Sequence, residues 1–188
     1  IDLAHRLDRD TSGVIFLTRD LDANRFLKAA LQEGRCRKDY LALCRGHAPF
    51  ETKSLTGPIG YRGEEIRIQM AVRDDGLPAR TDVTVLGQRQ RLTRVRCRLH
   101  TGRTHQIRVH LAHEGLPILG DRLYGVPPQV FLDTLDHGVT DATVEATGAP
   151  RHALHAWRTS VPHPDGGEVT VTSPKPDDMR RWWADDGG

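Results

Sequence analysis

Two clusters of polar residues in this chain have types and spacing that suit chemistry. The first, His5–Gly13 (HRLDRDTSG), places Asp8 between Arg6 and Arg9 directly before an apolar segment. A carboxylate between two arginines, on a loop that leads into a buried strand, can be kept ionised beside a cleft. The same composition is also typical of a plain turn, because Asp and Ser cap loops and Gly interrupts regular structure. Composition alone favours the turn.

The second cluster is Leu99–Leu111 (LHTGRTHQIRVHL), which overlaps a helix predicted over Thr104–Glu114. On that helix His105 and Arg108 are neighbours at i, i+3. Backbone amides at the helix start, together with Arg103, suit a phosphate group. An amphipathic helix with a solvated basic face explains the same residues, so both interpretations stay open.

Histidines suggest a metal site, but their pattern does not specify one. His105, His110 and His113 are spaced by five and three residues, and His152 and His155 by three. There is no HExxH motif, and zinc needs three or four convergent ligands with supporting partners. A phosphate-binding GxxxxGK[ST] loop is also missing from the sequence. We therefore predict neither a metal ion nor another cofactor.

The net charge of +2 conceals an uneven distribution. Between Val83 and His113 there are seven arginines and no acidic residue, which leaves 20 basic against 25 acidic residues elsewhere. A local arginine-rich surface is the expected footprint for phosphate contacts, although a solvated strand face explains it equally well. The window Leu123–Pro150 has acidic residues and no Lys or Arg, so we expect it to face away from a polyanion.

Length and composition narrow the class of protein further. The 188 residues, 37% of them apolar, suit one domain with its own core. Cys36, Cys44 and Cys97 offer neither a disulfide framework nor a CxxC clip. No membrane-spanning run and no signal peptide are seen. We expect a cytoplasmic, monomeric protein.

Hydrophobic periodicity predicts an α+β fold with a largely antiparallel sheet. Strands are predicted at Gly13–Thr18, Lys38–Arg45, Ile66–Val72, Thr81–Leu86, Leu92–Leu99, Ala153–Ser160 and Glu168–Thr172. Besides the helix over Thr104–Glu114, one helix is predicted from the cap Asp20 to Gly34, and another begins at Pro176. Residues 126–150 are expected to form a surface excursion.

Four segments resemble, in the same order, the motifs of RluA-type pseudouridine synthases. They are His5–Gly13, Arg37–Ala42, Gly102–Leu111 and Leu116–Gly125, with Leu154–Ala156 as a weaker fifth match. A single motif of this kind can arise by chance, but four long motifs in the same order are specific to the family. The resemblance implies the fold of that family, a mixed sheet with flanking helices and a central catalytic cleft. It also implies an isomerase that converts uridines of ribosomal or transfer RNA to pseudouridine without a cofactor or metal.

The same resemblance implies roles for individual residues. Asp8 corresponds to the catalytic carboxylate, Arg108 to its ion-pair partner, and Tyr40 to the tyrosine against the uracil ring. Leu154 corresponds to an apolar wall of the pocket, and Arg6 to a residue that contacts the flipped nucleotide. Arg103 and the strand arginines are expected to hold phosphates. The remaining residues assigned to substrate binding are Arg9, Thr11, His105 and Gln106.

The chain departs from the family pattern at its start. Seven residues precede Asp8, and the first residue is Ile, whereas family members ordinarily have further strands upstream. We therefore expect one catalytic domain over residues 1–188 whose N-terminal strands are missing. A non-catalytic RNA-binding module of the same fold is the alternative that the basic residues would equally allow, and a metal-dependent hydrolase is a third.

Overall fold

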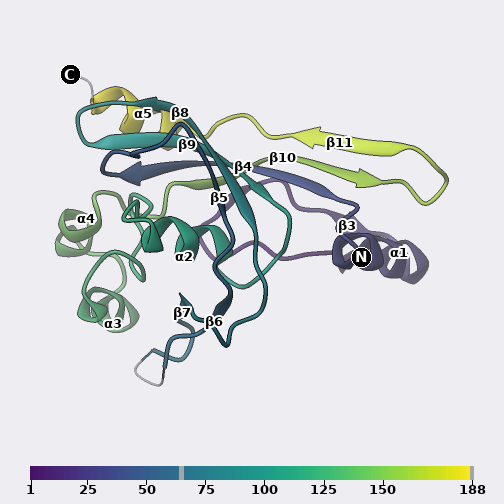
Figure 1. The fold of residues 1–188 in the computed structure, drawn as a ribbon, viewed down its shortest axis with the longest axis horizontal. Helices are drawn as coiled ribbons and strands as arrows, with labels where there is room; N and C mark the ends of the chain where they lie inside the picture. Colours follow the sequence, from purple (N-terminus) through teal and green to yellow (C-terminus); the bar gives the residue numbers. More distant parts are fainter. Residues whose placement is uncertain (64–65, 187–188) are drawn as a thin grey trace.

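A seven-stranded sheet forms the middle of the molecule in the computed structural model, which describes residues 1–63 and 66–186 (Figure 1). Six of its strands are antiparallel and lie in the order β11, β10, β4, β9, β8, β5, while β2 pairs with β10 in parallel. These strands are β2 (Ser12–Gly13), β4 (Arg37–Arg45), β5 (Thr52–Leu55), β8 (Thr81–Gln88), β9 (Leu92–Leu99), β10 (Leu154–Pro162) and β11 (Glu168–Thr172). The predicted α+β class with a mainly antiparallel, mixed sheet is confirmed.

Two short ribbons and several helices flank this sheet. The ribbons are β1 (Asp2–Leu3) with β3 (Leu17–Thr18), and β6 (Ile59–Tyr61) with β7 (Met70–Val72). The helices are α1 (Leu21–Gln32), α2 (Gln106–His113), α3 (Pro128–His137), α4 (Asp141–Thr147) and α5 (Asp177–Asp185). Figure 1 shows α1 and the N-terminus at one end of the molecule and α3, α4 and α5 towards the other. No helix among the described residues is long and apolar enough to cross a membrane.

Helix α1 forms where its capping residues predict it. The Asp20 side chain accepts a hydrogen bond from the Ala23 amide at 2.8 Å, which satisfies one of the free N–H groups of the first turn. Gly34 follows the last turn with a φ of 71°, a conformation that glycine adopts without steric cost. Leu27 and Ala30 are buried against Val161 of β10.

Alternation along β9 separates the two faces of the sheet. Val95 and Cys97 are fully buried, and Ile107 and Leu111 of α2 belong to the same apolar core. Since Tyr40 pairs directly with Cys97, its side chain stands on this same face. The core therefore places α2 and the side chain of Tyr40 on the same face of the sheet.

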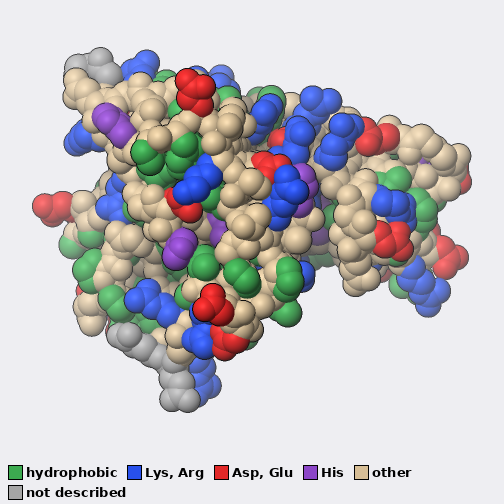
Figure 2. All heavy atoms as spheres, in the orientation of Figure 1, with side chains coloured by type: hydrophobic (Ala, Val, Ile, Leu, Met, Phe, Trp, Pro, Cys, Tyr) green, Lys and Arg blue, Asp and Glu red, His purple; other side chains and the backbone are tan. Residues whose placement is uncertain are grey.

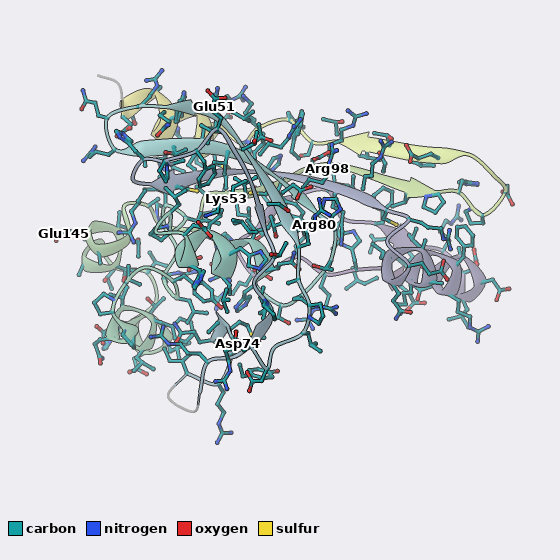
Figure 3. All side chains as sticks on the ribbon, viewed as in Figure 1. Glu51, Lys53, Asp74, Arg80, Arg98 and Glu145 are labelled. Carbon is teal, nitrogen blue, oxygen red and sulfur yellow. The ribbon has the colours of Figure 1, made fainter. Side chains whose placement is uncertain are left out.

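The other face of the sheet carries paired charges. Arg98 donates two hydrogen bonds to Asp39 at 3.0 and 3.2 Å, and Asp82 accepts hydrogen bonds from Arg80 and is bonded to His100. Burial alone raises the pKa of Asp82, but its hydrogen bonds hold that pKa well below the ordinary value. Figure 3 shows Arg80 and Arg98 near one another beside the central strands, and Figure 2 shows acidic side chains among the Lys and Arg there.

Two predicted strands differ in the structure. Residues 13–18 divide into β2 and β3, because the Val14 amide bonds to the carbonyl of Ala156 while Ile15 and Leu17 are exposed. Within Ile66–Val72, only β7 is a strand. Ile66 is buried, Ile68 is half exposed, and residues 66–68 form a turn. Alternating apolar residues thus signalled an element that packs on one side but not a continuous strand.

Several elements were not predicted. They are β1, β5, β6, α3 and α4. Residues 126–150 contain the last two: α3 has no fully buried residue, whereas Thr143 and Thr147 of α4 are buried. The side chain of Glu145 in α4 points away from the sheet at the edge of the molecule (Figure 3).

Candidate active site

An open cleft of about 1070 Å³ lies where the N-terminal loop, the start of α2, β4 and β10 meet. All ten residues predicted for the site line it. They are Asp8, Tyr40 and Arg108, together with Arg6, Arg9, Thr11, Arg103, His105, Gln106 and Leu154. The structure therefore brings together residues up to 148 positions apart in the sequence, which the order of the motifs alone does not require.

The guanidinium of Arg108 connects two carboxylates. Its Nη1 donates to Asp8 Oδ2 at 3.2 Å, while its Nε and Nη2 donate to the two oxygens of Asp121 at 2.7 and 2.9 Å. Asp121 is fully buried and also accepts from the backbone amides of Leu123 and Tyr124. Asp121 therefore fixes the guanidinium, and the remaining edge faces Asp8.

Charges in this cluster are set by the same contacts. Burial alone raises the pKa of Asp121, but the hydrogen bonds and positive charge of Arg108 hold it below its ordinary value. For Arg108, burial lowers the pKa, and the bond to Asp121 with the charges of Asp121 and Asp8 more than reverses that effect. Both groups are therefore ionised at neutral pH.

The loop that carries Asp8 is fastened to the segment just before β10. The Thr11 amide donates to the Asp8 carbonyl at 3.0 Å, and the Thr11 hydroxyl bonds to His152 Nε2 at 2.7 Å. The Asp10 side chain forms an ion pair with Arg122. The positive φ of 73° at Asp10 marks a tight left-handed bend that these contacts hold. Thr11 thus holds the loop that carries the Asp8 carboxylate, and its assignment to substrate binding stays a prediction.

Tyr40 forms part of the floor of the cleft. The residue lies on β4, is only 7% exposed, and still borders the cleft beside Leu154. Burial, with a contribution from the charge of Asp8, raises the pKa of Tyr40 to about 12. Its phenol is therefore protonated at neutral pH, and its ring and the aliphatic side chain of Leu154 offer an apolar surface next to an ion pair.

The side chain of Gln106 is buried and forms its hydrogen bonds within the protein. Its carbonyl oxygen accepts from the Thr101 hydroxyl and the Arg103 amide, and its amide donates to the Arg80 carbonyl and to Thr81. These four bonds hold the 101–103 loop against β8. Gln106 therefore shapes the wall that carries Arg103, and its assignment to substrate binding stays a prediction.

His105 connects the cleft with the β6–β7 ribbon through Tyr124. The Tyr124 hydroxyl accepts from the Met70 amide at 3.0 Å and lies 2.8 Å from His105 Nδ1. The Tyr124 hydroxyl is therefore bonded to both groups, and either ring tautomer of His105 forms the second bond. Burial and the charge of Arg108 lower the pKa of His105, which agrees with a neutral ring.

Lys and Arg dominate the charge of the cleft. Among the described residues that line it, seven are Lys or Arg and one, Asp8, is acidic. The basic residues are Arg6, Arg9, Lys28, Lys38, Arg67, Arg103 and Arg108. Only the last two come from the arginine-rich window, because Arg94, Arg96 and Arg98 of β9 lie outside the cleft lining. The expectation that strand arginines hold phosphates therefore concerns RNA outside this cleft, and it stays a prediction.

The histidines considered as metal ligands have other partners. His110 bonds to Thr81 and to the Gly57 carbonyl, His152 to Thr11, and His155 to Ser12. Within residues 1–63 and 66–186, no three His, Cys, Asp or Glu side chains are placed to share a metal ion.

Asp121 and Tyr124 are the functional residues that the sequence analysis did not assign. Both lie in Leu116–Gly125, a segment that matched a family motif without a stated role. Asp121 anchors Arg108, and the Tyr124 ring lies 5.1 Å from the centre of that guanidinium. The available signal in the sequence was the carboxylate of Asp121, which lies in a family motif to which no chemistry had been assigned.

Solved structures of the same fold carry this arrangement of elements. Human RNA Pseudouridylate Synthase Domain Containing 1 superposes with a TM-score of 0.76 at 28% identity, covering 96% of this chain and 72% of that one. Human RNA Pseudouridylate Synthase Domain Containing 4 gives a TM-score of 0.74 at 25% identity, covering 97% and 74%. The fold and the cleft together define a protein of the pseudouridine synthase fold class.

The family model described as RNA pseudouridylate synthase matches residues 1–113. The chain belongs to the RNA pseudouridylate synthase family, as the resemblance of its motifs predicted. It is 40% identical over 178 residues to ribosomal large subunit pseudouridine synthase D of Nitrosomonas europaea, covering 94% of this chain and 48% of that protein. It is 40% identical over 186 residues to ribosomal large subunit pseudouridine synthase C of Escherichia coli O157:H7, covering 96% and 54%. The chain thus spans about half the length of these curated relatives.

Replacing Asp121 tests the anchor of Arg108. Asp121→Asn leaves a buried guanidinium without its counter-charge, so we expect the free energy of unfolding to fall by about 3–5 kcal/mol. Asp75→Asn is the matched control, because Asp75 accepts from Arg73 with the same distances of 2.7 and 2.9 Å but at the surface, where such pairs contribute little. Urea unfolding at pH 7.5 measures both variants, and equal effects would contradict a special role for the buried pair.

His152 makes stability depend on pH. Burial, aided by the charge of Arg108, lowers its pKa to about 4, whereas an unfolded histidine titrates near 6.5. The unfolded state therefore binds more protons below pH 6.5, and the stability that neutral His152 contributes is lost as the pH falls towards 4. Between pH 7.5 and 5, wild type should lose about 2 kcal/mol more than His152→Gln.

The matched control for that experiment is His163→Gln, at an exposed position in the β10–β11 turn. It should show the same loss as wild type. If His152→Gln loses as much stability as wild type across this range, the buried ring is not the titrating group.

Proposed function

We propose that this protein converts uridine to pseudouridine in ribosomal RNA, with Asp8 as the catalytic carboxylate. The observation that carries this proposal is the ion pair between Asp8 and Arg108, next to Tyr40, in a cleft lined by cations. A nucleophilic carboxylate needs a partner that keeps it ionised and oriented, and an anchored guanidinium supplies both.

The isomerisation conserves atoms, so the site needs no cofactor and no metal. The N1–C1′ glycosidic bond breaks, the uracil turns while it is bound, C5 joins C1′, and the C5 proton leaves while N1 gains one. Asp8 acts as the nucleophile in the step that detaches the base. The cleft must hold the detached uracil, and the apolar surface formed by Tyr40 and Leu154 is suited to its ring.

Tyr40 contributes by contact with the base. With its pKa raised to about 12, its phenol is a weak general base at neutral pH. Stacking on the uracil ring is therefore the role that its buried position supports, and its hydroxyl remains a hydrogen-bond donor.

RNA is the substrate class because of the charge of the cleft. Cations that border a cleft attract a phosphate backbone and give an affinity that depends on salt. Arg6 and Arg9 are exposed beside Asp8 in the sequence, and Arg103 lines the same cleft. A uridine must leave its stack to reach Asp8, and these arginines can hold the flanking phosphates while it does so.

Relatives narrow the class of RNA. The two bacterial relatives named above are ribosomal large subunit pseudouridine synthases, which favours ribosomal over transfer RNA and a reaction in the cytoplasm. All ten proposed site residues come from one chain, so we propose that a monomer is sufficient.

Asp8→Asn tests the catalytic assignment. It keeps the shape of the side chain but removes the nucleophilic charge, so we expect pseudouridine formation to fall by on the order of 10³-fold or more. Transcribed large-subunit ribosomal RNA of Escherichia coli serves as substrate, and chemical labelling maps its pseudouridines. Asp75→Asn, which alters an exposed carboxylate, should retain full activity.

A non-catalytic RNA-binding module makes the opposite prediction. Wild type would then bind the transcript without forming pseudouridine. Retained turnover in Asp8→Asn would instead remove Asp8 from the mechanism and leave the rest of the proposal standing.

A further inference from the structure

The β6–β7 ribbon places exposed apolar side chains at the edge of the cleft. Tyr61 is 69% exposed and Ile68 is 51% exposed, and both line the cleft together with Arg67. Single exposed apolar residues are common on protein surfaces. Here Tyr61 and Ile68 border the same cavity as the ion pair of Asp8 and Arg108. The cation Arg67 is part of the same lining.

Tyr61 extends a face of the ribbon that is otherwise buried. Ile59 at the base of the ribbon and Met70 at the start of β7 are 1% and 9% exposed, and they pack with Val109 of α2 and with Tyr124. Tyr61 lies opposite Met70 in the strand register and two residues from Ile59, so it belongs to the same face. The apolar face therefore continues past the elements that cover it and reaches the cleft.

Two buried hydrogen bonds hold this ribbon in place. The Gln69 side chain donates to the Leu123 carbonyl at 2.8 Å, and the Met70 amide donates to the Tyr124 hydroxyl at 3.0 Å. Both acceptors lie just after Asp121, which anchors Arg108. The ribbon, labelled β6 and β7 in Figure 1, is thus fixed to the loop that organises the ion pair. Tyr61 therefore lies on an element whose position is fixed.

We infer that Tyr61 is a stacking platform for a nucleotide adjacent to the target uridine, a role that rests on the proposed function. Bases of single-stranded RNA stack on exposed aromatic side chains, and every base has a face that suits this contact. Tyr40, on the cleft floor, is the tyrosine placed to receive the flipped uracil, so Tyr61 at the rim meets a different base. Arg67, which lines the same cleft, matches the negative charge of the RNA backbone.

This role predicts a dependence on the ring rather than on hydrophobicity. Tyr61→Phe keeps the ring and should retain activity within about twofold of wild type. Tyr61→Ala and Tyr61→Leu both remove it, and each should lower kcat/KM on the transcribed large-subunit ribosomal RNA by about 5- to 150-fold. Because Tyr61 is exposed, its replacement should leave the unfolding midpoint unchanged.

Leu77→Ala is the matched control. Leu77 is 60% exposed and pairs with Ile59 at the base of the same ribbon, but it does not belong to the cleft lining. Its replacement should leave kcat/KM unchanged. A transcript that contains 4-thiouridine supplies a second readout, because irradiation should join it to Tyr61 in wild type.

Outcomes separate the two proposals. If wild type forms no pseudouridine, the proposed function fails and the stacking role fails with it. If wild type is active and Tyr61→Ala is as active, the stacking role alone is wrong. Full activity in Tyr61→Leu, an equal loss in Leu77→Ala, or the absence of a crosslink at Tyr61 would likewise overturn it.

Discussion

The site depends on one guanidinium that serves two carboxylates. A buried Arg108 without compensation would be strongly destabilising, because the charge has lost its hydration. Asp121 supplies that compensation through two hydrogen bonds and is itself held by two backbone amides. The edge left for Asp8 makes a single, longer contact of 3.2 Å. Asp8 is thereby oriented without being enclosed, and 27% of its side chain stays accessible from the cleft.

The two faces of the sheet carry different groups of side chains. One face holds the core, Tyr40 and the cleft, while on the other Arg98 and Asp39 form an ion pair of their own. Basic residues far exceed acidic ones in the cleft lining, which does not include the arginines of β9. The loop of Asp8 runs onto β10, and the β6–β7 ribbon attaches to the loop of Asp121. These two parts of the cleft wall are therefore connected to the ion pair by hydrogen bonds.

Much of this fold can be predicted because its signals are local. The Asp20 cap, the alternation along β9 and the apolar run of β4 each depend on a few neighbouring residues, and the structure confirms the elements they indicate. The segment 66–72 was wrong as a strand because its apolar residues alternate although residues 66–68 turn. The helices α3 and α4 gave weak signals, since few of their residues are buried.

The site could be predicted from motifs but not from composition. Asp8 and Arg108 are 100 residues apart, and no periodicity in the sequence joins them, so their pairing rested on the family resemblance. The sequence analysis did not assign Asp121, because this carboxylate acts by holding the side chain of Arg108. The bonds of Gln106 to Thr101 and Arg80 are likewise visible only in three dimensions.

The most direct test of the central claim is the single-turnover rate of pseudouridine formation by Arg108→Lys, measured on the transcribed ribosomal RNA beside its urea unfolding curve. A lysine carries the same charge but has one donor group in place of a fork, so it cannot bond both oxygens of Asp121 and still reach Asp8. The account predicts a folded protein whose rate falls by on the order of 10²-fold or more. A folded variant with a rate within a few-fold of wild type would contradict it.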